Sequence, residues 1–368
     1  VEKIQMMVHW WLLPLHVLLL LVVLPTPGDC TLDDANKASS FCASPSFISK
    51  NVALVFVKPH ANTAAVRELV AQTLTQSFGM VIQSEHDLDP TMVEEKLDRH
   101  YFAISSRAMS NTKTPTALRN DNDIPTNRFQ EAFGESWDQV VQEQRIISAQ
   151  DACERFKCTP DQLLNWWSQS KTIVKLGGGK YCGQLPSNFL AEEEENKRST
   201  PLYVWNGFYP SMRSTFMAGP GIHCYVVEWN PKNKKDIHWK DFRHQVLGTT
   251  DPAKAVHGSL RQIILERYAE LGLTSEPTPG NNGVHGSASP LESLAERNNW
   301  LDLDIASDPF GAALLQANIP QETILSWFLD PQVVLPDGTR GSIFDHLEDM
   351  DTADCISELV TIYFQGKK

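Results

Sequence analysis

A continuous apolar run at 52–57 constrains the fold of this 368-residue chain more than any other stretch. Six apolar residues without polar alternation predict a strand that is buried on both faces. The run ends at Lys58-Pro59, and 64–77 has the spacing of an amphipathic helix. A lysine at the end of a buried strand can meet a phosphate as a point charge, although a solvated strand end is the simpler interpretation.

Later segments continue this alternation of strands and helices, which is typical of a mixed α and β fold. The predicted elements are strands at 78–82, 202–205 and 223–229, and helices at 91–100 and 260–271.

The segment between the two halves of the pattern is long. A polar link at 111–127 precedes predicted helices at 137–144 and 149–170, the second with a turn and a capped restart at Thr159-Pro160. Three consecutive glycines, 177–179, lie between two lysines. The Lys-Ser/Thr pair and the helix of a phosphate loop do not follow them, so a hairpin turn is predicted instead.

Two later loops carry chemistry. In the first, Thr250 and Arg261 are brought together by a Gly/Pro-framed loop, and a hydroxyl with a guanidinium fork can bind phosphate. In the second, His285 lies among small and polar residues that leave its imidazole accessible, and Ser287 and Ser289 offer hydroxyls that can cap the helix that follows. A lone histidine in such a loop is more often a surface residue, so its interpretation depends on partners elsewhere in the chain.

The chain resembles the nucleoside diphosphate kinase family, in a divergent form with a large insertion of the kind found in algae and protists. The resemblance covers roughly 51–101 and 203–300. It rests on Lys-Pro after the first strand, His-Tyr after the second helix, Gly-x-Thr-x-Pro-Ala, Gly-Ser-Leu-Arg and Asn-x-x-His-Gly-Ser-x-Ser. Seven positions follow the family order: Lys58, Tyr101, Phe208, Thr250, Arg261, Asn282 and His285.

The resemblance implies an α+β fold whose ferredoxin-like antiparallel sheet is covered by helices. The kinase-like domain would span 51–300, interrupted by a mainly helical insertion at 103–201, and a helical extension would occupy 301–368. Family members commonly assemble as hexamers or tetramers, so a homo-oligomer stays open here.

The resemblance also implies the chemistry. His285 would accept the γ-phosphoryl group of ATP and pass it to a nucleoside diphosphate, with Mg²⁺ bridging the nucleotide phosphates and no metal ligand from the protein. Glu296 would orient His285. Phe208 would stack on the base, with a core aromatic as the alternative. The implied phosphate and positioning contacts are Lys58, Thr250 and Arg261, with Tyr101 and Asn282.

Two positions depart from the family pattern. His60 stands where an aspartate is usual, and His244 stands four residues before Gly248, where an arginine is expected, with Arg243 adjacent. These departures keep a second hypothesis open, a catalytically weak or inactive nucleotide-binding or interaction module with the same fold.

The N-terminal segment differs in kind. Lys3, an apolar run at 7–24 and a Pro-Thr-Pro-Gly exit predict a signal peptide at 1–28, with an uncleaved membrane anchor as the alternative. A flexible lead-in is predicted at 29–50, and no stable membrane span is expected after cleavage. The expected location is the secretory pathway or the extracellular space. Ala38-Ser39-Ser40-Phe41 leaves open the plastid of a complex-plastid alga.

Charge and cysteine content limit the partners. The net charge of −13 argues against broad nucleic-acid binding, so the expected partners are nucleoside di- and triphosphates. The seven cysteines show no zinc pattern, and their odd number leaves at least one unpaired within the chain. The acidic stretch at 345–351 is interpreted as a solvated face rather than a cation site.

Overall fold

The computed structural model of the protein describes residues 50–109, 124–186, 200–232 and 236–367, all within one compact unit. The predicted signal peptide and nearly all of the predicted lead-in lie outside these residues. In the described part of the chain, no helix combines the length and the apolar character of a membrane span.

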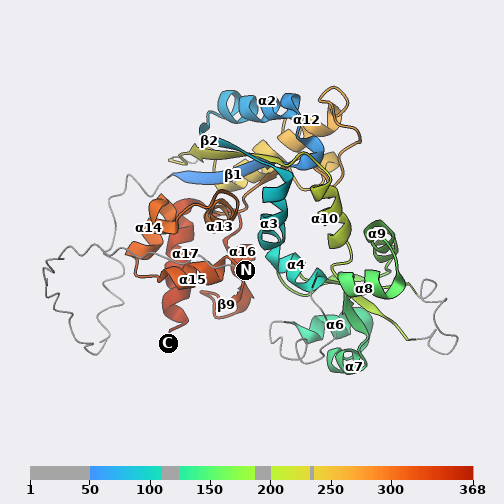
Figure 1. The fold of residues 1–368 in the computed structure, drawn as a ribbon. Coiled ribbons are helices and arrows are strands. Elements are labelled where there is room, and N and C mark those ends of the chain that lie inside the picture. The colour runs from blue at the N-terminus through green and yellow to red at the C-terminus, as the bar shows by residue number, and fades with distance from the viewer. Residues whose placement is uncertain (1–49, 110–123, 187–199, 233–235, 368) are drawn as a thin grey trace, which may run out of the picture. The chain divides into compact units, whose positions relative to one another are not determined.

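A four-stranded antiparallel sheet, called the central sheet because helices cover both of its faces, lies in the upper part of the view in Figure 1. Its strands are β1 (Asn51–Val57), β2 (Val81–Leu88), β7 (Ile222–Trp229) and β8 (Val284–Gly286). They are ordered β2-β7-β1-β8, and each neighbouring pair is antiparallel. Because β7 lies between β1 and β2, the first β-α-β unit is split by a third strand, which is the ferredoxin-like arrangement. The predicted α+β class is confirmed.

Helices cover both faces of this sheet. One face carries α2 (Ala64–Gln72), η3 (Thr73–Ser77), η5 (Phe242–Leu247) and α12 (Leu260–Glu266), and the other carries α3 (Pro90–His100) and α13 (Pro290–Leu301). Val55 packs on the first face and Phe56 on the second, both fully buried. Since both faces of β1 are covered, every position along it favours an apolar residue, which explains the continuous run.

Some predicted boundaries shift. The strand predicted at 78–82 begins at Val81, because Gly79 adopts a φ of +64° and Met80 N–H donates to the Leu74 carbonyl, which closes the preceding helix first. The helix predicted at 260–271 ends at Glu266 and continues as turns.

The segment between the two halves of the sheet folds around its own core. Its described elements are α4 (Phe102–Ala108), α6 (Thr126–Phe133), α7 (Trp137–Gln142), β3 (Ile146–Ser148), α8 (Ala149–Phe156), α9 (Pro160–Ser168), β4 (Ile173–Lys175), β5 (Tyr181–Gln184), β6 (Tyr203–Trp205) and α10 (Tyr209–Met217). The capped restart at Thr159 and the hairpin at the three glycines are confirmed.

A second sheet in this segment was not predicted from the sequence. Its order is β3-β6-β5-β4, so β6 pairs with strands of the inserted segment and not with the central sheet. Strands of three and four residues are too short to show a period, which is why the pattern indicated mainly helix.

The residues after α13 form a helical extension with a small hairpin. It contains η7 (Ile305–Ser307), α14 (Pro309–Gln316), α15 (Gln321–Trp327), β9 (Gln332–Val334), β10 (Arg340–Ser342), α16 (Ile343–Leu347) and α17 (Thr352–Gln365). Its core includes Leu291 and Leu294, so α13 is shared between the extension and the central sheet. Short helical pieces η2 (Pro59–Ala61), α11 (Trp239–Asp241) and η6 (Pro252–Lys254) complete the described elements.

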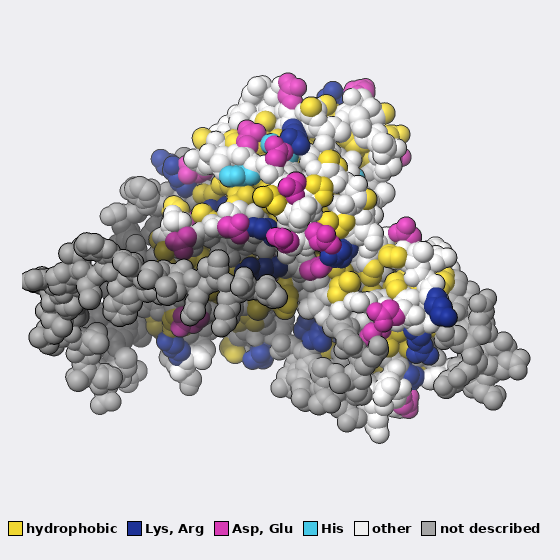
Figure 2. Space-filling model, viewed as in Figure 1, with side chains coloured by type: hydrophobic (Ala, Val, Ile, Leu, Met, Phe, Trp, Pro, Cys, Tyr) yellow, Lys and Arg dark blue, Asp and Glu magenta, His cyan; other side chains and the backbone are white. Residues whose placement is uncertain are grey.

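Charged side chains of both signs are interspersed on the face shown in Figure 2, and Lys and Arg do not gather into one patch there. This distribution fits the acidic net charge of the chain.

Candidate functional site

His285 lies in β8, directly opposite Phe56 of β1. Its imidazole stacks on the Phe56 ring with a centroid distance of 4.5 Å, and the His100 ring meets it edge-on at 5.0 Å. The flanking glycines allow this close packing. Gly283 has a φ of +86°, and a Cβ on Gly286 would lie 2.5 Å from a Leu247 methyl group.

One nitrogen of His285 is held by a buried carboxylate. Nε2 lies 2.5 Å from Oε1 of Glu296, and the Ser287 hydroxyl donates to Oε2 of the same carboxylate at 2.6 Å. Glu296 reaches this point because Ser289 caps α13 by accepting from the Glu292 N–H at 3.2 Å. Glu296 thus fixes the ring orientation and leaves Nδ1 as the nitrogen for another partner.

Burial keeps the imidazole neutral. It holds the pKa of His285 well below the ordinary value, and the positive charges of Lys58, Arg261 and Arg243 lower it further. Burial also raises the pKa of Glu296 to about 8. A neutral imidazole beside several cations can accept an electrophile that carries negative charge.

Lys58 and Arg261 supply two of these cations. Lys58 Nζ donates to the Gly280 carbonyl at 3.3 Å, and Arg261 Nη1 donates to the Gly248 carbonyl at 2.7 Å. Burial, followed by the charge of Arg261, lowers the pKa of Lys58 to about 7. Burial, followed by Arg243, lowers the pKa of Arg261 to about 10. Buried cations crowded together in this way are stabilised when an anion binds between them.

Arg243, and not His244, supplies the third cation. Both residues lie in η5, which is a π-helical turn. A π turn holds one more residue than an α turn. Arg243, five residues before Gly248, therefore occupies the position that His244, four residues before Gly248, would have in an α-helix. The His244 side chain is 48% exposed and lies 3.6 Å from Asp349.

Arg243 is held by the C-terminal extension. Its Nη1 lies 2.7 Å from Asp349, and its Nη2 pairs with Glu348. Asp349 therefore belongs to an intramolecular ion pair. Asp351 is used in the same way, since its carboxylate accepts from Asn51 at 2.6 Å and pairs with His238 at 2.5 Å.

Hydrogen bonds connect the loops next to His285. His60 Nε2 accepts from the Gly283 N–H at 3.1 Å, and burial with the nearby Lys58 charge lowers the pKa of His60 to about 4. A neutral His60 thus supports the backbone before His285, as the usual aspartate could. Asn282 donates to the Thr250 carbonyl at 3.0 Å, while its own buried Oδ1 has no partner. Thr250 itself is exposed.

A cavity of about 280 Å³ reaches His285 from the Glu296 side. Tyr101 and His100 line it together with Glu292 and with residues of the C-terminal extension such as Phe328. Burial raises the pKa of the Tyr101 hydroxyl, so it stays protonated. Sequence reasoning did not identify His100. The only available signal was its place next to Tyr101.

Phe208 does not join this group. It packs against Trp167 at 5.6 Å and Tyr181 at 6.0 Å, in the core of the inserted segment. This packing is compatible with the core-aromatic alternative, and the role of Phe208 as a base contact stays a prediction. The spacing along the chain could not show this packing, because Trp167 and Tyr181 belong to the segment that interrupts the family pattern.

One group of potential metal ligands occurs among the described residues, formed by His100, His285 and Glu296, with ligand atoms within 4.8 Å of one another. Glu296 already contacts His285 Nε2, and three cations act on the same imidazole. This electrostatic environment opposes a bound cation, so the group is better suited to orienting His285 than to holding a metal.

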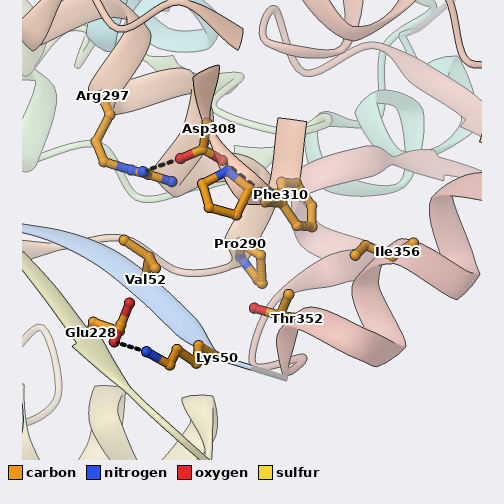
Figure 3. Close-up of a pocket in the computed structure, with 10 residues that line it drawn as sticks. Lys50, Val52, Glu228, Pro290, Arg297, Asp308, Phe310, Thr352 and Ile356 are labelled. Atoms are coloured by element: carbon orange, nitrogen blue, oxygen red, sulfur yellow. Dashed lines mark hydrogen bonds and ion pairs between the residues drawn. The ribbon is translucent and has the colours of Figure 1, made fainter. Parts of the chain in front are cut away.

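A second cavity, of about 270 Å³, lies at the other end of β1 (Figure 3). Its wall contains two ion pairs, Arg297 with Asp308 at 2.5 Å and Lys50 with Glu228 at 2.6 Å. It shares none of its lining residues with the cavity beside His285.

Comparison with known proteins gives a weak likeness. No family model and no curated protein matches the chain. Among solved structures, an NDP kinase from Pyrobaculum aerophilum is similar at 15% identity and a TM-score of 0.28, over 68% of this chain and 95% of that one. The fold class stated above rests on the strand order, and the site on the contacts around His285.

Proposed function

We propose that the protein transfers phosphoryl groups from ATP to nucleoside diphosphates through a phosphohistidine at Nδ1 of His285. The observation that carries this proposal is a neutral, oriented imidazole, held 2.5 Å from Glu296 and subject to the charges of Lys58, Arg243 and Arg261. Mg²⁺ enters with the nucleotide phosphates as part of the substrate.

In the first half-reaction, the Nδ1 lone pair attacks the γ-phosphorus and the bond to the ADP oxygen breaks. Nε2 keeps its proton and donates a hydrogen bond to the ionised Glu296, whose negative charge offsets the positive charge that develops on the ring. ADP leaves, and an acceptor nucleoside diphosphate enters. Its terminal oxygen then attacks the phosphorus, the N–P bond breaks, and His285 returns to the neutral form.

The cations stabilise charge on the transferred group. Lys58 acts as a point charge from the end of β1, and Arg261 presents a guanidinium whose orientation is fixed by the Gly248 and Val284 carbonyls. The buried Oδ1 of Asn282, which lacks a partner, can accept a hydrogen bond from a ribose hydroxyl. Thr250 is proposed as a further phosphate contact and Tyr101 as a positioning residue, and a stacking role of Phe208 on the base remains a prediction.

The test is transfer from γ-labelled ATP. Wild-type protein should acquire label in an acid-labile, base-stable bond, and His285→Ala should acquire none. Glu296→Gln keeps the shape but removes the charge, so its labelling rate should fall by about 10²-fold. Label that persists in His285→Ala would remove the phosphohistidine from the proposal.

The second candidate is a nucleotide-binding module without turnover. The observation in its favour is that Arg243 is already paired with Glu348 and Asp349. Calorimetric binding of ADP and ATP without label transfer would support it, whereas coupled turnover of ATP with a second nucleoside diphosphate would support the enzyme.

A further inference from the structure

Two cysteines of the inserted segment lie on either side of a helix end. Cys153 is in the last turn of α8, and Cys158 lies two residues beyond its end at Phe156. The Cys158 N–H donates to the Cys153 carbonyl at 3.2 Å, and Lys157 between them has a φ of +49°. The Lys157 N–H also donates to the Cys153 carbonyl, so this helix end combines the six-residue bond of the Schellman motif with the five-residue bond of the αL motif.

The motif brings these two side chains together. In a Schellman motif the residue two beyond the helix end contacts the residue in the last turn that accepts its hydrogen bond. Here both residues are cysteines, and each thiol contributes to the shifted pKa of the other. Both are partly exposed, so a small reagent can reach them.

The other described cysteines are placed differently. Cys182, Cys224 and Cys355 are fully buried on β5, β7 and α17, each in a different core. Cys153 and Cys158 therefore combine proximity, a fixed backbone and access, and the three buried cysteines serve as internal controls.

We propose that Cys153 and Cys158 form an intramolecular disulfide by exchange with a low-molecular-weight disulfide. The thiolate of one cysteine attacks a sulfur of the reagent, which forms a mixed disulfide and releases one reagent thiolate. The second cysteine, as its thiolate, attacks the protein sulfur of that mixed disulfide and releases the other reagent thiolate. Two electrons pass from the cysteine pair to the reagent, and the two cysteine protons end on the two reagent thiols.

The bond would join Cys153 in the last turn of α8 to Cys158, which directly precedes Thr159, the N-cap of α9. Trp167 of α9 packs against Phe208 in the core of the inserted segment. The cross-link would therefore fix the α8–α9 junction, from which α9 enters that core. Burial raises the pKa of Cys153 to about 12 and also raises that of Cys158. Thiolates are therefore scarce at neutral pH, so exchange in the folded protein reaches equilibrium slowly.

The test uses the full chain at equilibrium with reduced and oxidised glutathione, followed by alkylation of free thiols under denaturing conditions and peptide mapping by mass spectrometry. We expect the peptide that contains both cysteines to be unalkylated and about 2 Da lighter than its reduced form. Cys182, Cys224 and Cys355 should be fully alkylated. Alkylation of Cys153 and Cys158 across the whole glutathione range, or glutathione bound separately to each, would overturn the proposal.

Matched variants at Lys157 test the geometry. Lys157→Gly suits the left-handed conformation and should keep the equilibrium constant for the cross-link at or above the wild-type value. Lys157→Val carries a β-branched side chain that disfavours this conformation, so the constant should fall roughly tenfold. Equal constants in the two variants would show that the turn does not hold the pair together and would count against the proposal. Circular dichroism shows whether each variant is folded.

Discussion

The position of one proton decides what His285 can do. Its nearest partner is Glu296, and the two share a single short contact. If Glu296 is protonated, its O–H donates a hydrogen bond to Nε2. The single N–H proton of the neutral imidazole then lies on Nδ1, so Nδ1 has no lone pair for attack. If Glu296 is ionised, Nε2 holds the proton and Nδ1 is free to attack. The active form therefore needs an ionised Glu296 and a protonated Lys58.

The pH profile of the phosphoryl-transfer reaction follows from this requirement. Glu296, with a pKa of about 8, ionises as the pH rises, and Lys58, with a pKa of about 7, loses its charge over a similar range. We expect kcat/KM to be bell-shaped with its maximum between these two values. Glu296→Gln should flatten the acid limb and Lys58→Met the alkaline limb. Identical profiles in all three proteins would contradict the assignment.

Ionisation of the buried Glu292 lowers the free energy of unfolding as the pH rises. Burial, with repulsion from Glu296, raises its pKa to about 8. The folded state therefore binds the proton more tightly than the unfolded state, so stability is lost as pH rises from the ordinary glutamate value of about 4.3 towards the folded value. Glu292→Gln keeps the acceptor for the Ala288 N–H. It should stabilise the protein by about 1–2 kcal/mol at pH 8 and have little effect at pH 4. Urea unfolding at both pH values measures this difference.

At the scale of elements, the site depends on register. His285 meets Phe56 because β8 pairs with β1, and Glu296 meets His285 because α13 begins at its Ser289 cap. The π turn of η5 places Arg243 instead of His244 near His285. The extension then pairs Arg243 with Glu348 and Asp349, which would compete with a phosphate under the proposed function.

Removal of this competition should strengthen nucleotide binding. In Glu348→Gln/Asp349→Asn the guanidinium of Arg243 is released, and we expect ADP to bind about fivefold more tightly, which corresponds to ~1 kcal/mol for partly exposed ion pairs. Arg243→Ala should weaken binding instead. His244→Ala is the matched control and should leave the affinity unchanged. Calorimetric titration measures all three, and weaker binding in the double variant would show that the carboxylates position Arg243 rather than compete for it.

The predictions from sequence were correct for elements long enough to show a hydrophobic period. The buried strand at β1, the amphipathic helix after it and the capped restart at Thr159 were all correct. The second sheet was not predicted, because its strands are short. In addition, β6 pairs with β3 although α8, α9 and the β4–β5 hairpin lie between them in the sequence. No local pattern encodes that pairing.

On the scale of the whole molecule, the described residues bury several separate cores. Trp239 lies in the core under η5, and Trp205 lies in that of the inserted segment, both fully buried. α13 is the one described helix whose residues enter both the core of the extension and the core beneath β1. Loss of packing in the inserted core should therefore remain more local than loss beneath the central sheet.

Two matched substitutions test this separation. Trp205→Ala and Trp239→Ala each create a large cavity and should each cost about 3–5 kcal/mol. Hydrogen exchange should show lost protection at 124–205 in the first variant, with β1 still protected. The second variant should expose β1 and its neighbours. Equal loss of protection along the whole chain in both variants would show that the cores unfold as one unit.

Local features of this protein could be predicted from its sequence: the buried strand, the helix caps and the hairpin at the glycines. Each depends on residues that are close in the chain, where side-chain period and backbone preference act directly. The contacts between distant residues came from tertiary packing. Packing placed His100 edge-on to His285, brought Arg243 near it instead of His244, and set Phe208 against Trp167 and Tyr181. These outcomes depend on strand register, a π turn and burial, which arise when distant segments pack together.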